Sequence, residues 1–307
     1  MNAGGSPELL ARARILERAR DYAGVVALLE PAGDTHVAEP ELGYRLAYAW
    51  RRLGRTREAL SLTEALDGPV RRRAEDPLAR RRVSLEAMLR YDIGQVARAE
   101  QLWERLAADS TEAGDHVLAA AACNNLGVVR TLQDRTEEAL ASYNRALLAS
   151  RRLGDRRGLA QAHQNLGILF REKGLGREAD SHFRRAIAHA RASGSEDVFG
   201  RAEEERALLF LDRDDEPLAT IAARRALERL RAIGDVAGTG EALRVLGIAA
   251  LRRGDRSAAR DAFREALENA TASGSALLRA ETLEALGLLE AVEGQDDRAE
   301  GHRREAA

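Results

Sequence analysis

The apolar positions of this chain recur at a fixed interval of 40 residues. The first series is leucine, with Arg206 as its single exception: Leu126, Leu166, Leu246 and Leu286. The position after each of these is always small: Gly127, Gly167, Ala207, Gly247 and Gly287. Alanine forms a third series that runs in steps of 40 from Ala59 to Ala299. Three series with one period indicate an internal structural repeat, which is typical of stacked units rather than of one compact core.

Two breaks divide each repeat into two helices. One break pairs a glycine with an aspartate or serine: Gly114-Asp115, Gly154-Asp155, Gly194-Ser195, Gly234-Asp235 and Gly274-Ser275. Glycine readily adopts the left-handed conformation that closes a helix, and Asp or Ser side chains accept hydrogen bonds from the first amides of the next one. The second break falls near Asp134, Gly174, Asp214 and Gly254. This pattern predicts about eight helical hairpins.

Large and small side chains alternate in a way that predicts how the hairpins pack. Tyr143, Phe183 and Phe263 follow the small residues at a constant distance, and we expect them to fill the space between neighbouring hairpins. The hairpin over residues 199–234 has Arg206 in the leucine series and Ala223 where others have an aromatic ring. We therefore expect this hairpin to pack more loosely.

These residues resemble those of a known family. Asn125-Leu126-Gly127 followed by Ala139, Tyr143 and Ala146, and Asn165-Leu166-Gly167 followed by Ala179, Phe183 and Ala186, resemble the tetratricopeptide repeat signature. That family's usual unit is 34 residues. The 40-residue version resembles the lengthened repeats of kinesin light chains, bacterial maltose-activator-type regulators and Gram-positive peptide-pheromone receptors. The resemblance implies an all-α fold, a right-handed α-solenoid superhelix of about eight tetratricopeptide-like hairpins.

We expect residues 1–307 to form a single solenoid. Residues 7–67 hold less regular hairpins, 68–79 a break, and 80–307 the regular repeats. Near the break, Arg71 to Arg73 and Arg80 to Arg82 form the densest charged feature. They indicate either a surface for an anionic partner or a solvated connecting helix, and we favour the second. The last residues, 295–307, read as a second helix with no polar capping helix after it, which suggests a fragment of a longer protein or an end covered by a partner.

Composition and motifs exclude several function classes. Lys and Arg total 48 against 50 Asp and Glu, so nothing favours a nucleic acid partner. The single Cys123 excludes an intrachain disulfide framework. No signal peptide or bilayer-length apolar run is present, so we expect a cytoplasmic location and no membrane contact. No catalytic motif occurs, and His182 with His189 read as a solvated helix face. We expect no enzyme activity, no cofactor and no metal.

The resemblance implies a binding groove lined by the first helix of each hairpin. Asn125 and Asn165, with Asn124 and Gln164 beside them, would hold a peptide backbone, because an amide both donates and accepts. Their alternative role is ordinary helix-surface polarity or a hydrogen bond between helices. An apolar series follows, and it forms either the groove floor or part of the core: Val128, Ile168, Leu208, Ile248 and Leu288. Flanking charges include Arg171, Arg201 and Arg244, of which Arg171 and Arg201 would contact acidic groups of a ligand.

The sequence therefore predicts a protein-interaction module that binds a peptide or a partner protein segment in its concave groove. One alternative is the sensor arm of a larger bacterial transcription regulator or signalling protein. Another is a structural scaffold that forms homo-oligomers through its uncapped ends.

Overall fold

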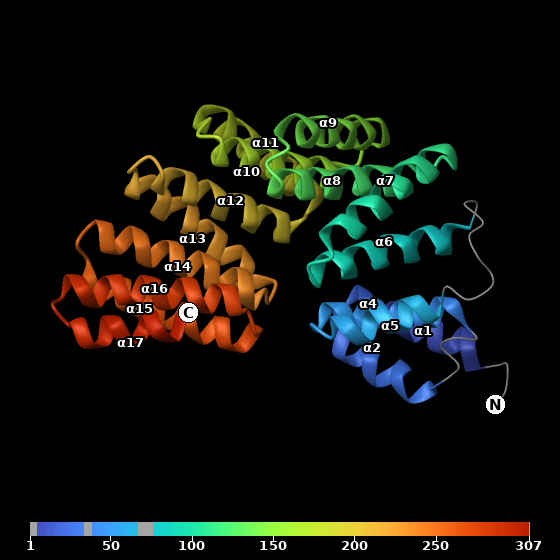
Figure 1. The fold of residues 1–307 in the computed structure, drawn as a ribbon, viewed down its shortest axis with the longest axis horizontal. Helices are drawn as coiled ribbons and strands as arrows, with labels where there is room; N and C mark the ends of the chain where they lie inside the picture. Colours follow the sequence, from blue (N-terminus) through green and yellow to red (C-terminus); the bar gives the residue numbers. More distant parts are fainter. Residues whose placement is uncertain (1–4, 34–38, 67–75, 307) are drawn as a thin grey trace. The chain divides into compact units, whose positions relative to one another are not determined.

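A computed structural model describes residues 5–33, 39–66 and 76–306 (Figure 1). These ranges hold sixteen α-helices, one short 3-10 helix, η1 (Glu30–Ala32), and no strand. The α-helices pair in chain order as α1 (Gly5–Arg18) with α2 (Tyr22–Leu29), α4 (Pro40–Arg52) with α5 (Thr56–Ala65), α6 (Pro77–Asp92) with α7 (Val96–Glu112), α8 (His116–Leu132) with α9 (Thr136–Leu153), α10 (Arg156–Glu172) with α11 (Gly176–Ser193), α12 (Glu196–Leu211) with α13 (Glu216–Ala232), α14 (Val236–Arg252) with α15 (Arg256–Ser273), and α16 (Ala276–Val292) with α17 (Asp296–Ala306). The predicted all-α solenoid of about eight hairpins is confirmed.

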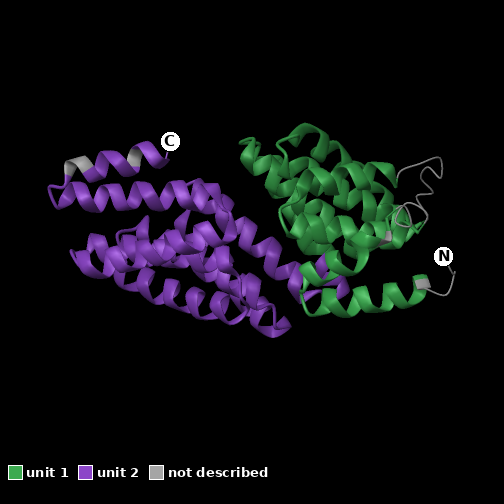
Figure 2. Cartoon of the chain, turned by 90° about the horizontal axis from the view of Figure 1, so that it is seen from below, with its two compact units in different colours: residues 1–149 green, residues 150–307 purple. Residues whose placement is uncertain are grey.

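The chain divides into two compact units, residues 1–149 and 150–307 (Figure 2). Within each unit, helices that follow one another in sequence pack side by side. The single solenoid over residues 1–307 stays a prediction. Most of the expected break at 68–79 lies outside the described residues, and α6 begins at Pro77. No helix in the described ranges combines the length and apolarity that crossing a membrane requires.

The turns have the predicted chemistry. All five glycines of the first break have φ between 65° and 71°. Asp134 and Asp214 adopt the same left-handed conformation without being glycine, with φ of 59° and 54°. Asp115, Asp155, Asp235 and Ser275 each accept a hydrogen bond from a first-turn amide of the next helix. Ser195 does not, and its hydroxyl accepts a hydrogen bond from the Ser193 hydroxyl at 2.9 Å.

Glycine and aromatic residues interlock inside each hairpin. A Cβ on Gly167 would lie 2.5 Å from Cδ1 of Phe183, and one on Gly247 would lie 2.4 Å from Cε1 of Phe263. Both rings are fully buried. Each ring packs on the glycine of its own hairpin, where any side chain would collide with it. The rings also cluster with Leu209 and Leu289 of the following hairpins, as expected.

The hairpin α12–α13 packs as extensively as its neighbours α10–α11 and α14–α15, so the expected looseness is wrong. Phe210 and Leu211 are buried with Ala223 in its core. Arg206 replaces the leucine of the series without disrupting the packing of the hairpin. Its guanidinium lies 4.9 Å from the centre of the Phe210 ring, and its Nε donates to Asp180 at 2.7 Å.

The second arginine cluster is structural. Arg80 and Arg82 are both only 7% exposed. Arg82 Nη1 donates to the carbonyl oxygen of Leu66 at 2.6 Å, and Arg80 lies 3.5 Å from Asp115. The favoured interpretation of a solvated helix is therefore wrong for these two residues, because they link neighbouring helices. Arg71 to Arg73 lie outside the described residues.

Candidate functional site

The first helices of the hairpins in unit 2 form one layer. α10 contacts α12, α12 contacts α14, and α14 contacts α16, whereas successive second helices contact one another far less. The first helices therefore lie on the more tightly curved side of this unit. We call the solvent-facing side of α10, α12, α14 and α16 the inner face.

Equivalent repeat positions form rows across the inner face. Gln164, Glu204 and Arg244 occupy one such position, and all three are partly buried. Ile168, Leu208 and Ile248 occupy another and pack at the edge of the core clusters, so they are neither free groove floor nor full core. Leu288, at the same position on α16, is 59% exposed.

The remaining predicted residues divide between the two units. Asn165 is partly buried on α10 of unit 2. Asn124, Asn125 and Val128 are partly buried on α8, in unit 1, where α8 contacts the preceding first helix α6. Each unit thus carries the predicted amide and apolar side chains on a first helix.

The predicted arginines already hold neighbouring hairpins together. Arg171 on α10 lies 3.4 Å from Glu205 on α12 and 3.4 Å from Asp212, just beyond that helix. Arg244 on α14 similarly lies 3.1 Å from Glu281 on α16. These contacts could not be read from the sequence, because each depends on how one hairpin is offset against the next.

Arg201 is the most accessible of the predicted arginines. Its side chain is 59% exposed and reaches Asp235 only at 3.5 Å. A contact at that distance between partly exposed charges is worth little. Arg201 is therefore the arginine most available to an acidic ligand.

Glu204 on α12 is a carboxylate of the inner face that is not among the predicted site residues. Unlike Glu205 and Glu241, it makes no ion pair with any described residue. Burial raises the pKa of Glu204 well above its ordinary value, and the neighbouring Glu205 and Glu241 raise it further. A cation brought by a ligand would stabilise the charged form of Glu204.

Three histidines meet in the core between α10 and α11. Nδ1 of the buried His163 lies 3.1 Å from Nδ1 of His182, and its ring stacks on His189 with centroids 5.7 Å apart. Burial, followed by the two other rings, lowers the pKa of His163 to about 3. The interpretation of His182 and His189 as a solvated face is wrong, since both pack against His163. The only available signal was that His163 falls at a buried repeat position.

The described residues contain no group of three or more His, Cys, Asp or Glu side chains arranged to hold a metal ion. The histidine cluster is therefore a packed core element. Cys123 is buried at the equivalent position of the preceding repeat. Burial raises the pKa of its thiol, which leaves it protonated and unreactive.

Comparisons with known proteins agree with this architecture. The sequence profile of the tetratricopeptide repeat family matches residues 118–192. No curated protein matches the chain. A Rap protein crystallised with competence and sporulation factor superposes with a TM-score of 0.68 at 11% identity, over 99% of this chain and 97% of that one.

Two further solved structures share the fold. A tetratricopeptide repeat protein from Parabacteroides merdae has a TM-score of 0.58 at 17% identity, over 90% of this chain and 98% of that one. A signal transduction ATPase with numerous domains and a tetratricopeptide repeat sensor, from Pyrococcus horikoshii, has a TM-score of 0.64 at 14% identity, over 95% of this chain and 45% of that one. The likeness to the lengthened 40-residue repeats stays a prediction. Residues 118–192 match the tetratricopeptide repeat family, and the rest of the chain shares the fold of solved tetratricopeptide repeat structures.

Proposed function

We propose that this chain is a protein-interaction module that binds a peptide or a partner protein segment along the inner face of unit 2. The observation that carries this proposal is the continuous layer of first helices, which sets a polar row beside an apolar row. The half-buried Ile168 and Leu208 offer shallow apolar contacts, and the amide of Gln164 can pair with a ligand backbone.

The charges of the inner face indicate the kind of ligand. Glu204 would pair with a basic group of the ligand, and the exposed Arg201 would pair with an acidic group. Arg171 and Arg244 contribute mainly by fixing the offset between hairpins. A face with both signs selects a ligand by where its charges lie. On α8 of unit 1, Asn124, Asn125 and Val128 would make contacts of the same type.

The fold comparisons support a binding role. The Rap structure that shares this fold holds competence and sporulation factor. At 11% identity this likeness concerns the fold alone, so the identity of the ligand does not transfer. Enzyme activity is not part of the proposal.

A selection from a random peptide display library tests the proposal. Selected peptides should bind the purified chain, and fluorescence anisotropy should show about tenfold weaker binding to Leu288→Glu and Glu204→Gln. Leu288 is exposed on the inner face, so its substitution leaves the core intact. Ile221 on α13 is 49% exposed on a second helix, and Ile221→Glu is the matched control that should bind normally.

Two outcomes contradict the proposal. Failure to enrich any peptide would remove the binding role. Equal losses in Leu288→Glu and Ile221→Glu would show that binding does not use the inner face. Circular dichroism of each variant checks that the helices remain formed.

The second candidate is a sensor arm of a larger signalling protein. It is favoured by the match of 95% of this chain to 45% of an ATPase with a tetratricopeptide repeat sensor. The complete reading frame tests it, because this candidate requires an ATPase or DNA-binding domain joined to the chain.

Self-association is a further candidate, since Leu277, Leu288 and Val292 are exposed along α16. Light scattering over a concentration series tests it, because a mass that stays at 33.5 kDa excludes it.

A further inference from the structure

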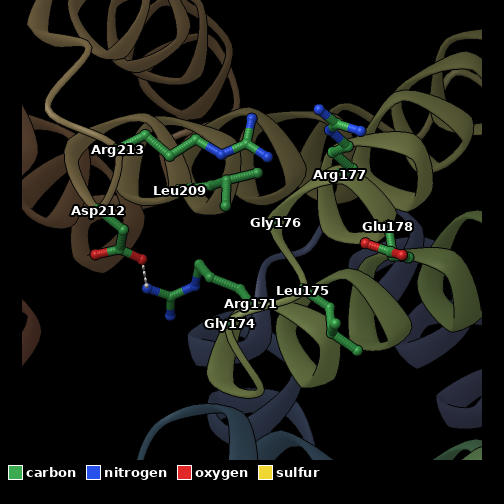
Figure 3. Close-up of a pocket in the computed structure, with 9 residues that line it drawn as sticks. All are labelled: Arg171, Gly174, Leu175, Gly176, Arg177, Glu178, Leu209, Asp212 and Arg213. Carbon is green, nitrogen blue, oxygen red and sulfur yellow. Dashed lines mark hydrogen bonds and ion pairs between the residues drawn. The ribbon is translucent and has the colours of Figure 1, made fainter.

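A cavity of about 400 Å³ lies between the α10–α11 turn and the end of α12, within unit 2 (Figure 3). Three arginines from two hairpins line it: Arg171 at the end of α10, Arg177 in the first turn of α11, and Arg213 just beyond α12. Leu175 and Leu209 supply its apolar wall. The cavity is separate from the polar and apolar rows of the inner face, and only Arg171 borders both.

The charges around the cavity are not balanced internally. Two carboxylates also line it, Asp212 and Glu178. Asp212 is held by Arg171 at 3.4 Å, as the dashed contact in Figure 3 shows. Glu178 makes no ion pair with a described residue. Within the described ranges, neither Arg177 nor Arg213 has a hydrogen-bond or ion-pair acceptor, so two guanidinium groups remain uncompensated at one cavity.

Comparison with the next repeat explains why Arg213 has no acceptor. Its equivalent 40 residues later, Arg253, donates to the Thr220 hydroxyl at 2.6 Å. The residue equivalent to Thr220 is Asp180, which would have been a stronger acceptor. Asp180 is instead paired with Arg206 at 2.7 Å and with Arg184 at 3.1 Å, and Arg206 is the residue that breaks the leucine series. Two other arginines thus occupy the carboxylate that corresponds to Thr220, and Arg213 lacks the contact that Arg253 makes.

The Arg213 guanidinium packs against Gly176. A Cβ on Gly176 would lie 2.7 Å from Nη2 and 2.8 Å from Nε of Arg213, so the guanidinium rests directly on the glycine backbone. The equivalent repeat positions carry side chains, namely Thr136, Glu216 and Arg256. The glycine brings Arg213 to the first turn of α11, beside Arg177. Two cations at a helix N-terminus repel each other and the helix dipole, and a bound anion would offset both effects.

We infer that this cavity binds an oxyanion, a phosphate or carboxylate group, between Arg177 and Arg213. The planar guanidinium presents paired N–H donors whose spacing matches two oxygens of either group. The apolar wall of Leu175 and Leu209 would contact the carbon part of the molecule that carries the anion. This site does not depend on what binds the inner face, so either proposal can fail alone.

Thermal unfolding of the full chain in inorganic phosphate tests the inference. Sodium chloride keeps the ionic strength constant, because screening alone changes the stability of charged surfaces. The midpoint temperature should rise saturably with phosphate concentration. A parallel series in acetate separates the two sources: a response to both anions shows that the site accepts carboxylates, and a response to phosphate alone assigns it to phosphate groups.

Three variants distinguish this site from general attraction to positive charge. Arg213→Gln should weaken phosphate binding by about tenfold or more. Gly176→Ala keeps the net charge but displaces the guanidinium, and it should weaken binding as well. Arg253→Gln removes the same charge at the equivalent position of the next repeat and should respond like the unmodified chain. The inference is overturned if phosphate gives no saturable response, or if Arg213→Gln and Arg253→Gln respond alike.

Discussion

Two hairpins of unit 2, α10–α11 and α14–α15, share a glycine–phenylalanine contact and differ at the buried position beside it. In both, a glycine of the first helix lies under a phenylalanine of the second. Four residues before the glycine, the first hairpin has His163 and the second has Leu243, which are 5% and 4% exposed. The glycine–phenylalanine contact is therefore common to these two hairpins, whereas the adjoining position accepts a polar ring or an aliphatic chain.

The difference teaches when a solenoid core tolerates a polar residue. A buried polar group is costly unless it has a hydrogen-bond partner. His163 has one because His182 projects from the partner helix at 3.1 Å, whereas Leu243 needs none. The same position in α12–α13 holds Glu203, which lies 3.6 Å from Arg225 and 3.9 Å from Arg206. Each polar substitution in the first helix is matched by a polar residue nearby.

The largest expected effect tests the shared glycine–phenylalanine contact. Phe183→Ala and Phe263→Ala should each lower the free energy of unfolding by about 3–5 kcal/mol, since both rings are fully buried and neither cavity can be filled by the glycine beside it. Urea unfolding followed by circular dichroism measures both. Nearly equal losses are expected, and a severalfold smaller loss in one hairpin would show that the two contacts are not equivalent.

The second prediction concerns the buried histidine. Burial lowers the folded-state pKa of His163 to about 3, with His182, His189, Arg185 and Arg151 acting in the same direction. The unfolded chain therefore binds more protons than the folded chain between pH 6.5 and pH 3, and stability falls as the pH falls through that window. At pH 5 the loss from this one residue is about 2 kcal/mol relative to neutral pH.

Unfolding experiments at pH 7 and pH 5 measure this effect. His163→Leu introduces into α10–α11 the leucine that α14–α15 has at Leu243. It should remove most of the loss of stability between pH 7 and pH 5. His116→Leu is the matched control, because His116 is exposed at the start of α8. An unchanged pH profile in His163→Leu would show that the buried ring is not the source of the sensitivity.

The shared glycine–phenylalanine contact could be predicted from the sequence and the histidine cluster could not. A left-handed turn at Gly154 or a small residue at Gly167 follows from local backbone and steric requirements, which every repeat must meet. The contact of His163 with His182 depends on which faces of α10 and α11 meet. Nothing in the local sequence of either helix specifies that pairing.

In the candidate site, too, some features could be predicted from the sequence and others could not. The rows that contain Ile168 and Gln164 follow from the repeat spacing, because equivalent positions on packed helices must align. The partners of Arg171 and the uncompensated Arg213 depend instead on the offset between hairpins and on the competition of Arg206 for Asp180. Repeat periodicity predicts the position of a residue on its helix. The packing of neighbouring hairpins determines which ion-pair partner its charged group contacts.

The smallest expected effect on stability concerns Glu203, which occupies in α12–α13 the position of His163 and Leu243. Burial raises the pKa of Glu203 above its ordinary value, and the attraction of Arg206 and Arg225 does not cancel that cost. A raised folded-state pKa means that stability is fully present below about pH 4.5 and is lost as the pH rises through the folded-state value. Glu203→Leu, which copies Leu243, should therefore stabilise the chain by roughly 1 kcal/mol at pH 7.

The advantage of Glu203→Leu over the unmodified chain should shrink toward pH 4, where the buried carboxyl is protonated in both states. Comparing the two proteins at each pH removes the contribution of His163, which both contain. Glu203→Gln separates charge from shape, because it keeps the size of the side chain and should recover part of the gain. If Glu203→Leu instead destabilises the chain at pH 7, the ion pairs with Arg206 and Arg225 outweigh the cost of burial, and the polar version of this core position contributes to stability in its own right.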